Sequence, residues 1–299
     1  MTPVHDKSLP SSCQLCALHA RRRFTALLAG AGAAVLSGGA IAQEGVQGDV
    51  GRTSRFTKMV SAAQIEAEAT QQYAQLAQQA ATKGELASDT HPQLLRLRAI
   101  ARRIIPFVAP WNALAPQWKW SVNLLLSPQI NAFCMPGGKI AFYAGILSKL
   151  QLSDDEVATI MGHEVAHALR EHARERRGKS MATRGAIEIG AAVFGLGDVA
   201  RMAAGAGGQL LTLKFGRDDE TEADIVGMDL AARAGYDPRA GVTLWQKMLR
   251  ASKGAPPQWL STHPSGDTRI QDIQAKLPKV LPLYERASKP QQRFGPPAA

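Results

Sequence analysis

The sequence is poor in cysteine, and the few that it has are badly placed for a shared structural role. Only three cysteines occur in 299 residues. Cys13 and Cys16 form a single CxxC pair with no second pair to complete a metal site, and they lie in a region that we expect to be removed. Cys134 is then alone, and a lone thiol is more often buried and inert than functional.

The sequence also lacks a long uninterrupted apolar run. Residues 26–36 are apolar but too short and too rich in Gly and Ala for a membrane span. Residues 185–213 are apolar as well, but Glu188, Asp198 and Arg201 interrupt them. For residues 185–213 we expect closely packed helices or a mobile flap over a cleft.

Acidic residues are fewer than basic ones, which leaves a formal net charge of +10. Residues 1–42 account for +3 of this, and the other basic residues are scattered without an RNA- or DNA-binding motif beside them. We therefore expect no nucleic-acid partner, and a solvated basic surface near anionic lipid is the more economical account. The 45% hydrophobic and 20% charged content is typical of a globular protein.

The start of the chain has the pattern of an export signal. Three arginines at residues 21–23 precede the apolar run, and Ala-Ile-Ala at residues 40–42 suits a signal peptidase. The twin-arginine and general secretory routes fit equally well. The sequence thus predicts a cleaved signal peptide and an exported, periplasmic protein. The expected divisions are residues 1–42 as signal, 43–60 as a flexible junction, 61–287 as one domain and 288–299 as a disordered tail.

The most informative motif is His163-Glu164-Val165-Ala166-His167. Residues four apart on a helix share a face, so the two imidazoles can bind one Zn²⁺ while Glu164 serves as general base. Ser153 and Glu156 form a capping-box pattern at the start of this helix. We expect the helix to continue through a polar end as far as Gly178.

A catalytic zinc needs a third protein ligand. The metzincin pattern is excluded because Arg170 and Ala173 stand where it needs Gly and His. His172 lies five residues after His167 among charges, and we expect it at the surface. Glu171, Glu175 and Glu188 are possible acids, and a conspicuous acidic cluster follows at residues 218–224. Within it Glu220 and Asp224 are four apart, so one can bind zinc while the other holds a His N–H, although a solvated acidic helix start fits this spacing as well.

The remaining patterns predict an α+β fold that is mainly helical. Helices are expected at residues 61–82, 92–107, 219–234, 238–250 and 268–276. Strands are expected at residues 118–126, 130–134 and 139–144, the last two joined by a turn at residues 135–138.

Four motifs together resemble peptidase family forty-eight, which includes the HtpX, BepA and CAAX prenyl protease types. They are the HExxH helix, Glu-Thr-Glu-Ala-Asp at residues 220–224, Asn-Ala-Phe-Cys-Met-Pro-Gly-Gly at residues 131–138, and His-Pro…Arg-Ile at residues 263–270. They occur in the family's order across about residues 118–275. The chain lacks the multiple membrane helices of the HtpX and prenyl protease types, so it is most similar to the soluble, exported branch.

The resemblance implies a zincin-like domain with a small β-sheet beside the active-site helix and one Zn²⁺ per chain. It implies His163, His167 and Glu220 as metal ligands and Asp224 as the partner that orients them. The edge strand at residues 131–138 would bind substrate, and the residues concerned are Asn131, Ala132, Phe133, Pro136, Gly137 and Gly138. A plain hairpin is the simpler alternative for this segment.

His263 and Arg269 would face the zinc region in such a fold. One of them would stabilise the oxyanion, or His263 would occupy the open zinc position in a resting state. The alternative is that this segment is only a capped helix start.

These expectations define a zinc endopeptidase that cleaves proteins of the cell envelope, in quality control of misfolded or misassembled proteins. Its partners would be protein or peptide substrates, with peripheral contact to a membrane or to the outer-membrane assembly machinery. A peptide-binding chaperone or assembly factor using the same cleft is the alternative. A basic nucleic-acid- or lipid-binding protein with a fortuitous motif is a second rival.

Overall fold

The computed structural model describes residues 45–194, 214–252, 257–264 and 268–297, with side chains left out at residues 185–194. All of them belong to one compact unit, residues 44–299. Among the helices in these ranges, none combines the length and apolar character needed to cross a bilayer.

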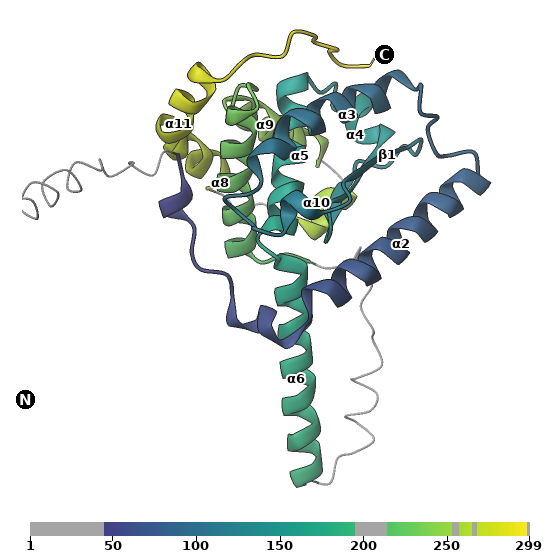
Figure 1. The fold of residues 1–299 in the computed structure, drawn as a ribbon, viewed down its shortest axis with the longest axis vertical. Helices are drawn as coiled ribbons and strands as arrows, with labels where there is room; N and C mark the ends of the chain where they lie inside the picture. Colours follow the sequence, from purple (N-terminus) through teal and green to yellow (C-terminus); the bar gives the residue numbers. More distant parts are fainter. Residues whose placement is uncertain (1–44, 195–213, 253–256, 265–267, 298–299) are drawn as a thin grey trace, which may run out of the picture. The chain divides into compact units, whose positions relative to one another are not determined.

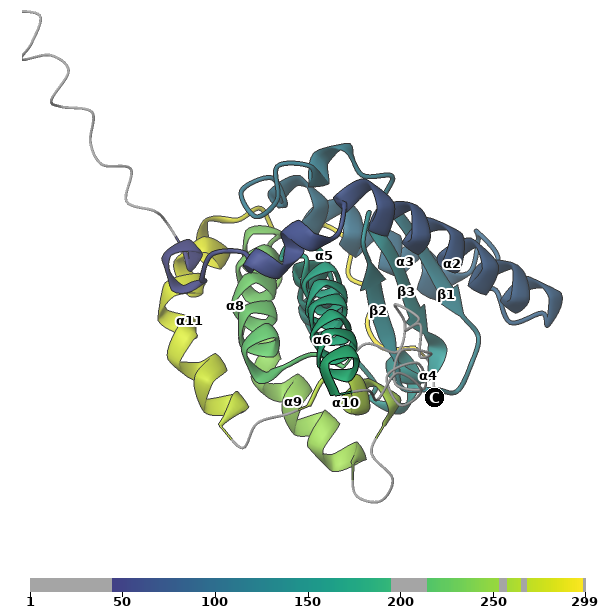
Figure 2. The ribbon, with the colours of Figure 1, turned by 90° about the horizontal axis from the view of Figure 1, so that it is seen from below.

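A three-stranded sheet forms one side of the unit, as Figure 2 shows. Its strands are β1 (Ser121–Leu125), β2 (Ala132–Met135) and β3 (Lys139–Tyr143), in the order β1-β3-β2. β3 runs parallel to β1 and antiparallel to β2, which leaves β2 at an edge. The turn between β2 and β3 uses Gly137 and Gly138 at φ values of 77° and 76°, which glycine adopts without strain. The three predicted strands and their turn are confirmed, although β1 is shorter than predicted.

The two faces of the sheet are covered by different helices because neighbouring residues of a strand point to opposite sides. Cys134 and Ile140 face the main core, in which α3 (Pro92–Ile104) also packs. Phe133 and Met135 point the other way, towards α2 (Ala62–Thr82). The small α4 (Ala144–Lys149), which the sequence analysis did not predict, follows β3 directly.

The central helix is α5 (Asp154–Leu169), whose predicted capping box is present. It packs along α8 (Arg217–Arg233), and the two helices come very close at Gly162 and Gly227. A Cβ on Gly162 would lie 2.6 Å from the Gly227 carbonyl oxygen, so this approach requires glycine. Three further helices follow, α9 (Ala240–Ala251), the short α10 (Gln258–Thr262) and α11 (Arg269–Arg286). α11 lies on the side of α8 away from the sheet, as Figure 1 shows.

The helix predicted to run from Ser153 to Gly178 is in fact two helices. α5 ends at Leu169, Glu171 has a positive φ of 59°, and α6 (His172–Phe194) starts in a new direction. Gly178 therefore lies inside α6, where it contacts the 3₁₀ helix η2 (Arg55–Met59). Of the apolar segment predicted at residues 185–213, the first ten residues continue α6 and the rest lie outside the described residues.

The two segments for which a flexible junction and a disordered tail were expected make contacts with the domain. Val46 is fully buried, and Asp49 at the end of η1 (Gln47–Asp49) pairs with Lys279 at 2.6 Å. In the tail, the Phe294 amide donates to Asp154 Oδ2 at 2.8 Å. The described parts of both segments thus pack on the domain through burial and charge pairing. The predicted signal peptide lies outside the described residues.

Candidate metal centre

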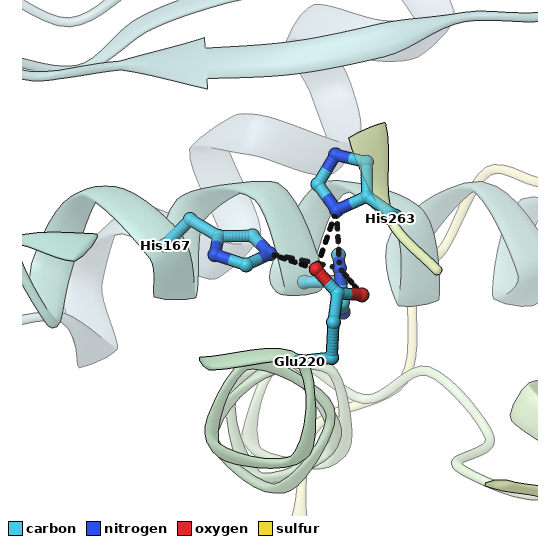
Figure 3. A group of neighbouring side chains, drawn as sticks. His167, Glu220 and His263 are labelled. Carbon is cyan, nitrogen blue, oxygen red and sulfur yellow. Dashed lines mark hydrogen bonds and ion pairs between the residues drawn. The ribbon is translucent and has the colours of Figure 1, made fainter. Parts of the chain in front are cut away.

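Helices α5 and α8 bring two histidines and a carboxylate together in the core. His163 Nε2 and His167 Nε2 are 3.0 Å apart, as expected for residues one turn apart on the same helix. Glu220, in the first turn of α8, places one oxygen 3.5 Å from His163 Nε2. Its other oxygen lies 3.3 Å from His167 Nε2 (Figure 3). All three side chains are buried. The structure therefore assembles the pair of adjacent imidazoles and the distant acid that the motifs predict.

His263, which follows α10, adds a fourth donor to this group. Its Nδ1 lies 2.9 Å from Glu220 Oε1 (Figure 3) and 3.3 Å from His163 Nε2. The four donor atoms lie within 4.8 Å of one another. A tetrahedral zinc with bonds of about 2.0–2.1 Å separates its ligand atoms by roughly 3.3–3.4 Å. The donor set and its spacing therefore fit a single zinc ion, which His163, His167 and Glu220 would hold with His263 as a further donor beside them.

Asp224 and Arg269 lie behind these donors. Asp224, one turn after Glu220, accepts a hydrogen bond from His163 Nδ1 at 2.9 Å. Arg269, the first residue of α11, contacts Asp224 through Nε at 2.7 Å and Nη2 at 2.8 Å, and Glu220 through Nη1 at 2.8 Å. Its guanidinium also stacks 3.7 Å from the ring of Trp245. The arginine thus clamps the two acids of α8 instead of pointing into open space.

Glu164 is buried beside the donors, and its partner is an aromatic residue that the sequence analysis missed. Trp259 Nε1 donates to Glu164 Oε1 at 2.6 Å, and its ring stacks on that of His263 with centroids 4.9 Å apart. Phe215, also missed, stacks on His167 at 3.9 Å. No spacing rule links these aromatic residues to the HExxH motif, so only the folded chain reveals them.

His172 is not at the surface, and that prediction is wrong. Its side chain is 2% exposed, and its Nδ1 lies 2.8 Å from His167 Nδ1. A continuous helix would have turned it away from His167, but the break at Glu171 returns it to the same side.

Burial and charge act in opposite directions on the donors. Burial lowers the pKa of His163, but hydrogen bonds to Asp224 and Glu220 outweigh it and raise this pKa to about 9. Burial holds the pKa of His167 well below its usual range. For Glu220, burial opposes ionisation, but three histidine rings outweigh it and lower its pKa well below the usual range. The surroundings therefore favour the ionised form of Glu220 and the charged form of His163, and they disfavour the charged form of His167.

A small cavity of about 40 Å³ lies between the metal centre and β2. Residues 131–136 line one side, with Glu164 and His263 on the other and Phe215 at the end. Of the residues expected to bind substrate, Asn131, Ala132, Phe133 and Pro136 line this cavity. Gly137 and Gly138 lie in the turn beyond it, where Gly138 packs under Trp120. Cys134 is buried, as expected, and burial raises the pKa of its thiol.

Two imidazoles and one glutamate, here His163, His167 and Glu220, are a ligand set typical of zinc hydrolases. The second glutamate, Glu164, lies beside this set. The model of peptidase family M48 matches residues 95–277. The chain therefore belongs to peptidase family M48, whose members are zinc-dependent metallopeptidases. The family resemblance, the mainly helical α+β fold and the zinc cofactor expected from the motifs are confirmed.

Several proteins of known function resemble this chain over its central part. The mitochondrial metalloendopeptidase OMA1 of Arabidopsis thaliana is 39% identical over 150 residues, which cover 50% of this chain and 30% of the relative. OMA1 of Schizosaccharomyces pombe is 34% identical over 193 residues, with coverages of 64% and 55%. The beta-barrel assembly-enhancing protease of Escherichia coli is 27% identical over 176 residues, with coverages of 56% and 36%. The chain thus spans about a third to just over half of the length of these relatives.

These relatives contradict the predicted periplasmic localisation. The two that align at 39% and 34% identity are named as mitochondrial, whereas the Escherichia coli protein aligns at 27%. The basic, arginine-containing start on which that prediction depended is a feature of mitochondrial transit peptides as well as of secretory signals.

Proposed function

We propose that this protein is an endopeptidase that hydrolyses peptide bonds within protein chains bound along β2. The observation that carries the proposal is the position of Glu164. Its carboxylate is buried next to the four-donor cluster and lines the cavity beneath the edge strand. A base, a metal site and a peptide-binding edge therefore meet at one place.

The residues divide the chemistry among them. His163, His167 and Glu220 would hold the zinc, which would supply a Lewis acid for the scissile carbonyl and for a water molecule. Glu164 takes a proton from the attacking water and delivers it to the amine that leaves as the C–N bond breaks. Asp224 accepts the Nδ1 hydrogen of His163 and so keeps its Nε2 directed at the metal site. Arg269 is better described as a positioning residue than as an oxyanion donor, because its three nitrogens are already bonded to Asp224 and Glu220.

The substrate would bind by adding a strand to β2. β2 pairs with β3 along one edge only, within the part of the sheet that the structure describes. A peptide that pairs with the other edge would gain backbone hydrogen bonds, and its side chains would supply the selectivity. Phe133, Met135 and Phe215 make the neighbouring cavity largely apolar. A small apolar side chain next to the scissile bond is therefore the best fit.

His263 would act as a resting-state ligand. Its Nδ1 lies within the donor cluster, 3.3 Å from His163 Nε2, where it would fill the position that a water molecule needs. Cleavage would then require this ring to withdraw. The alternative, a donor to the oxyanion, needs a ring that faces the substrate and not the metal.

For the biological role, we propose quality control of proteins. Quality control of misfolded or misassembled proteins is supported by the name of the Escherichia coli relative, a beta-barrel assembly-enhancing protease. Contact with a membrane or an assembly machinery rests on that name alone. A chaperone that only binds peptides in the same cleft is the competing function.

The decisive experiment replaces Glu164 with glutamine. We expect Glu164→Gln to bind zinc in a 1:1 ratio but to cleave labelled casein about 10²–10⁴ times more slowly, the usual contribution of a general base. Glu175→Gln is the matched control, because Glu175 pairs with Lys179 and touches no donor atom. Casein cleavage at the wild-type rate by Glu164→Gln would refute the proposed role. Full complementation of a deletion strain by this variant would favour the chaperone.

A further inference from the structure

His167 has a hydrogen-bond partner, His172, that takes no part in the proposed reaction. His167 Nδ1 lies 2.8 Å from His172 Nδ1, and the two rings meet edge to face with centroids 5.0 Å apart. A histidine that binds zinc through one nitrogen almost always donates its other N–H to a fixed acceptor. His172 occupies that acceptor's place.

The contact continues outward to an acid. His172 Nε2 is 3.4 Å from Glu222 Oε2, and Arg170 Nε is 2.9 Å from the same oxygen. The Arg170 side chain is 10% exposed and that of Glu222 27% exposed, so the far end of this series reaches solvent. His167, His172, Glu222 and Arg170 thus form one continuous series, which we call the His172 chain.

The Glu222 carboxylate at the outer end of the His172 chain sets the direction of each hydrogen bond in it. An ionised carboxylate only accepts hydrogen bonds, so His172 must carry its hydrogen on Nε2. When the ring carries only this hydrogen, its Nδ1 has a free lone pair and accepts from His167 Nδ1–H. His167 is thereby left with a free lone pair on Nε2, the nitrogen that faces the metal site.

We propose that His172 and Glu222 are positioning residues that fix the zinc-binding tautomer and the ring orientation of His167. The inference rests on the proposed function, because it assigns His167 as a zinc ligand. His163 has the equivalent arrangement in shorter form. It donates directly to Asp224, and Arg269 holds that carboxylate just as Arg170 holds Glu222.

The backbone supports the same conclusion. His172 reaches His167 only because Glu171 adopts a φ of 59°, a left-handed conformation that is uncommon for a residue other than glycine. Such conformations persist where the surrounding structure requires them. Here the residue after the strained position is the one that contacts His167.

The first test uses the wild-type protein loaded with zinc. Long-range ¹H–¹⁵N correlation spectra of its imidazoles should show hydrogen on Nδ1 of His167 and on Nε2 of His172. A His172 ring with its hydrogen on Nδ1 would overturn the proposal, and no variant needs to fold for this result.

The second test measures zinc affinity by competition with a chelator. We expect His172→Leu to bind zinc about 10–100 times more weakly than wild type, the usual effect of losing such a partner. Glu222→Gln should weaken binding less, because its amide oxygen can still accept from His172. Glu175→Gln, which lines the same charged cavity as His172 and Glu222, is the matched control and should bind like wild type.

The possible outcomes separate this inference from the proposed function. If the folded His172→Leu and Glu222→Gln proteins both bind zinc as tightly as wild type, the positioning role is wrong while the protease proposal stands. If wild type itself binds no zinc, the proposed function fails first. Should His172→Leu not fold, Glu222→Gln and the wild-type spectra still decide the question.

Discussion

Zinc binding at pH 7 should release one proton, and the proton should come from His163. The His163 ring lies between Asp224 and Glu220, with Nδ1 facing the first and Nε2 facing the second. Burial disfavours its charge, but these two carboxylates outweigh burial and raise its pKa to about 9. Zinc must displace the Nε2 hydrogen in order to bind.

The number of protons released follows from the protonation of the three predicted ligands, His163, His167 and Glu220. At pH 7 a group with a pKa of about 9 is roughly 99% protonated, so His163 contributes about one proton. His167 is already neutral and Glu220 is already ionised, so neither contributes. The apparent zinc affinity should therefore rise about tenfold per pH unit as the pH approaches 9.

The same shift affects the stability of the zinc-free protein. The folded-state pKa of His163 is raised above the usual 6.5, so the stabilisation is fully present below pH 6.5 and is lost as the pH rises through about 9. A difference of this size corresponds to about 3 kcal/mol. The melting temperature of the zinc-free protein should therefore fall between pH 7 and pH 9.5.

The assay is titration calorimetry in two buffers with different heats of ionisation, such as phosphate and Tris. The difference between the two binding enthalpies gives the number of protons released. Asp224→Asn removes one of the two carboxylates, and if the pKa of His163 returned to 6.5 the release at pH 7 would fall to about a quarter of a proton. Release of no proton or of two by wild type, or an unchanged release by Asp224→Asn, would refute the reasoning.

Two further substitutions test other parts of the structure. His263→Ala should raise the initial rate of casein cleavage several-fold if His263 blocks the open zinc position, whereas a loss of about 10² would identify it as an oxyanion donor. Gly178→Ala should destabilise the fold by about 1–3 kcal/mol, because the new Cβ would lie 2.0 Å from the Phe56 carbonyl oxygen, although alanine normally favours a helix. Thermal melts compare it with Gly48→Ala, which meets no atom within 4 Å and should be close to neutral; equal melting temperatures for the two variants would show that the Phe56 contact is not tight.

The local elements were largely predictable because their signals are short in range. The capping box at Ser153, the alternating strands and the Gly137-Gly138 turn each depend on residues within a few positions of one another, and all three are present. Where prediction erred, a distant contact or a single unusual backbone angle was responsible. The helix break occurs at a glutamate, Glu171, without the glycine or proline that would predict it from the sequence.

For the site, the sequence by itself determined the donor types and the pairing of His163 with His167, because a helix fixes the distance between residues four apart. The family resemblance then selected Glu220 from the acidic cluster. Only the tertiary structure decided which groups surround the donors: Trp259 on Glu164, Phe215 and His172 on His167, and Arg269 across the acids of α8. These contacts join segments that lie on different helices or on either side of a backbone break. Their geometry comes from the packing of α5, α8, α10 and α11 against one another, which no local spacing encodes.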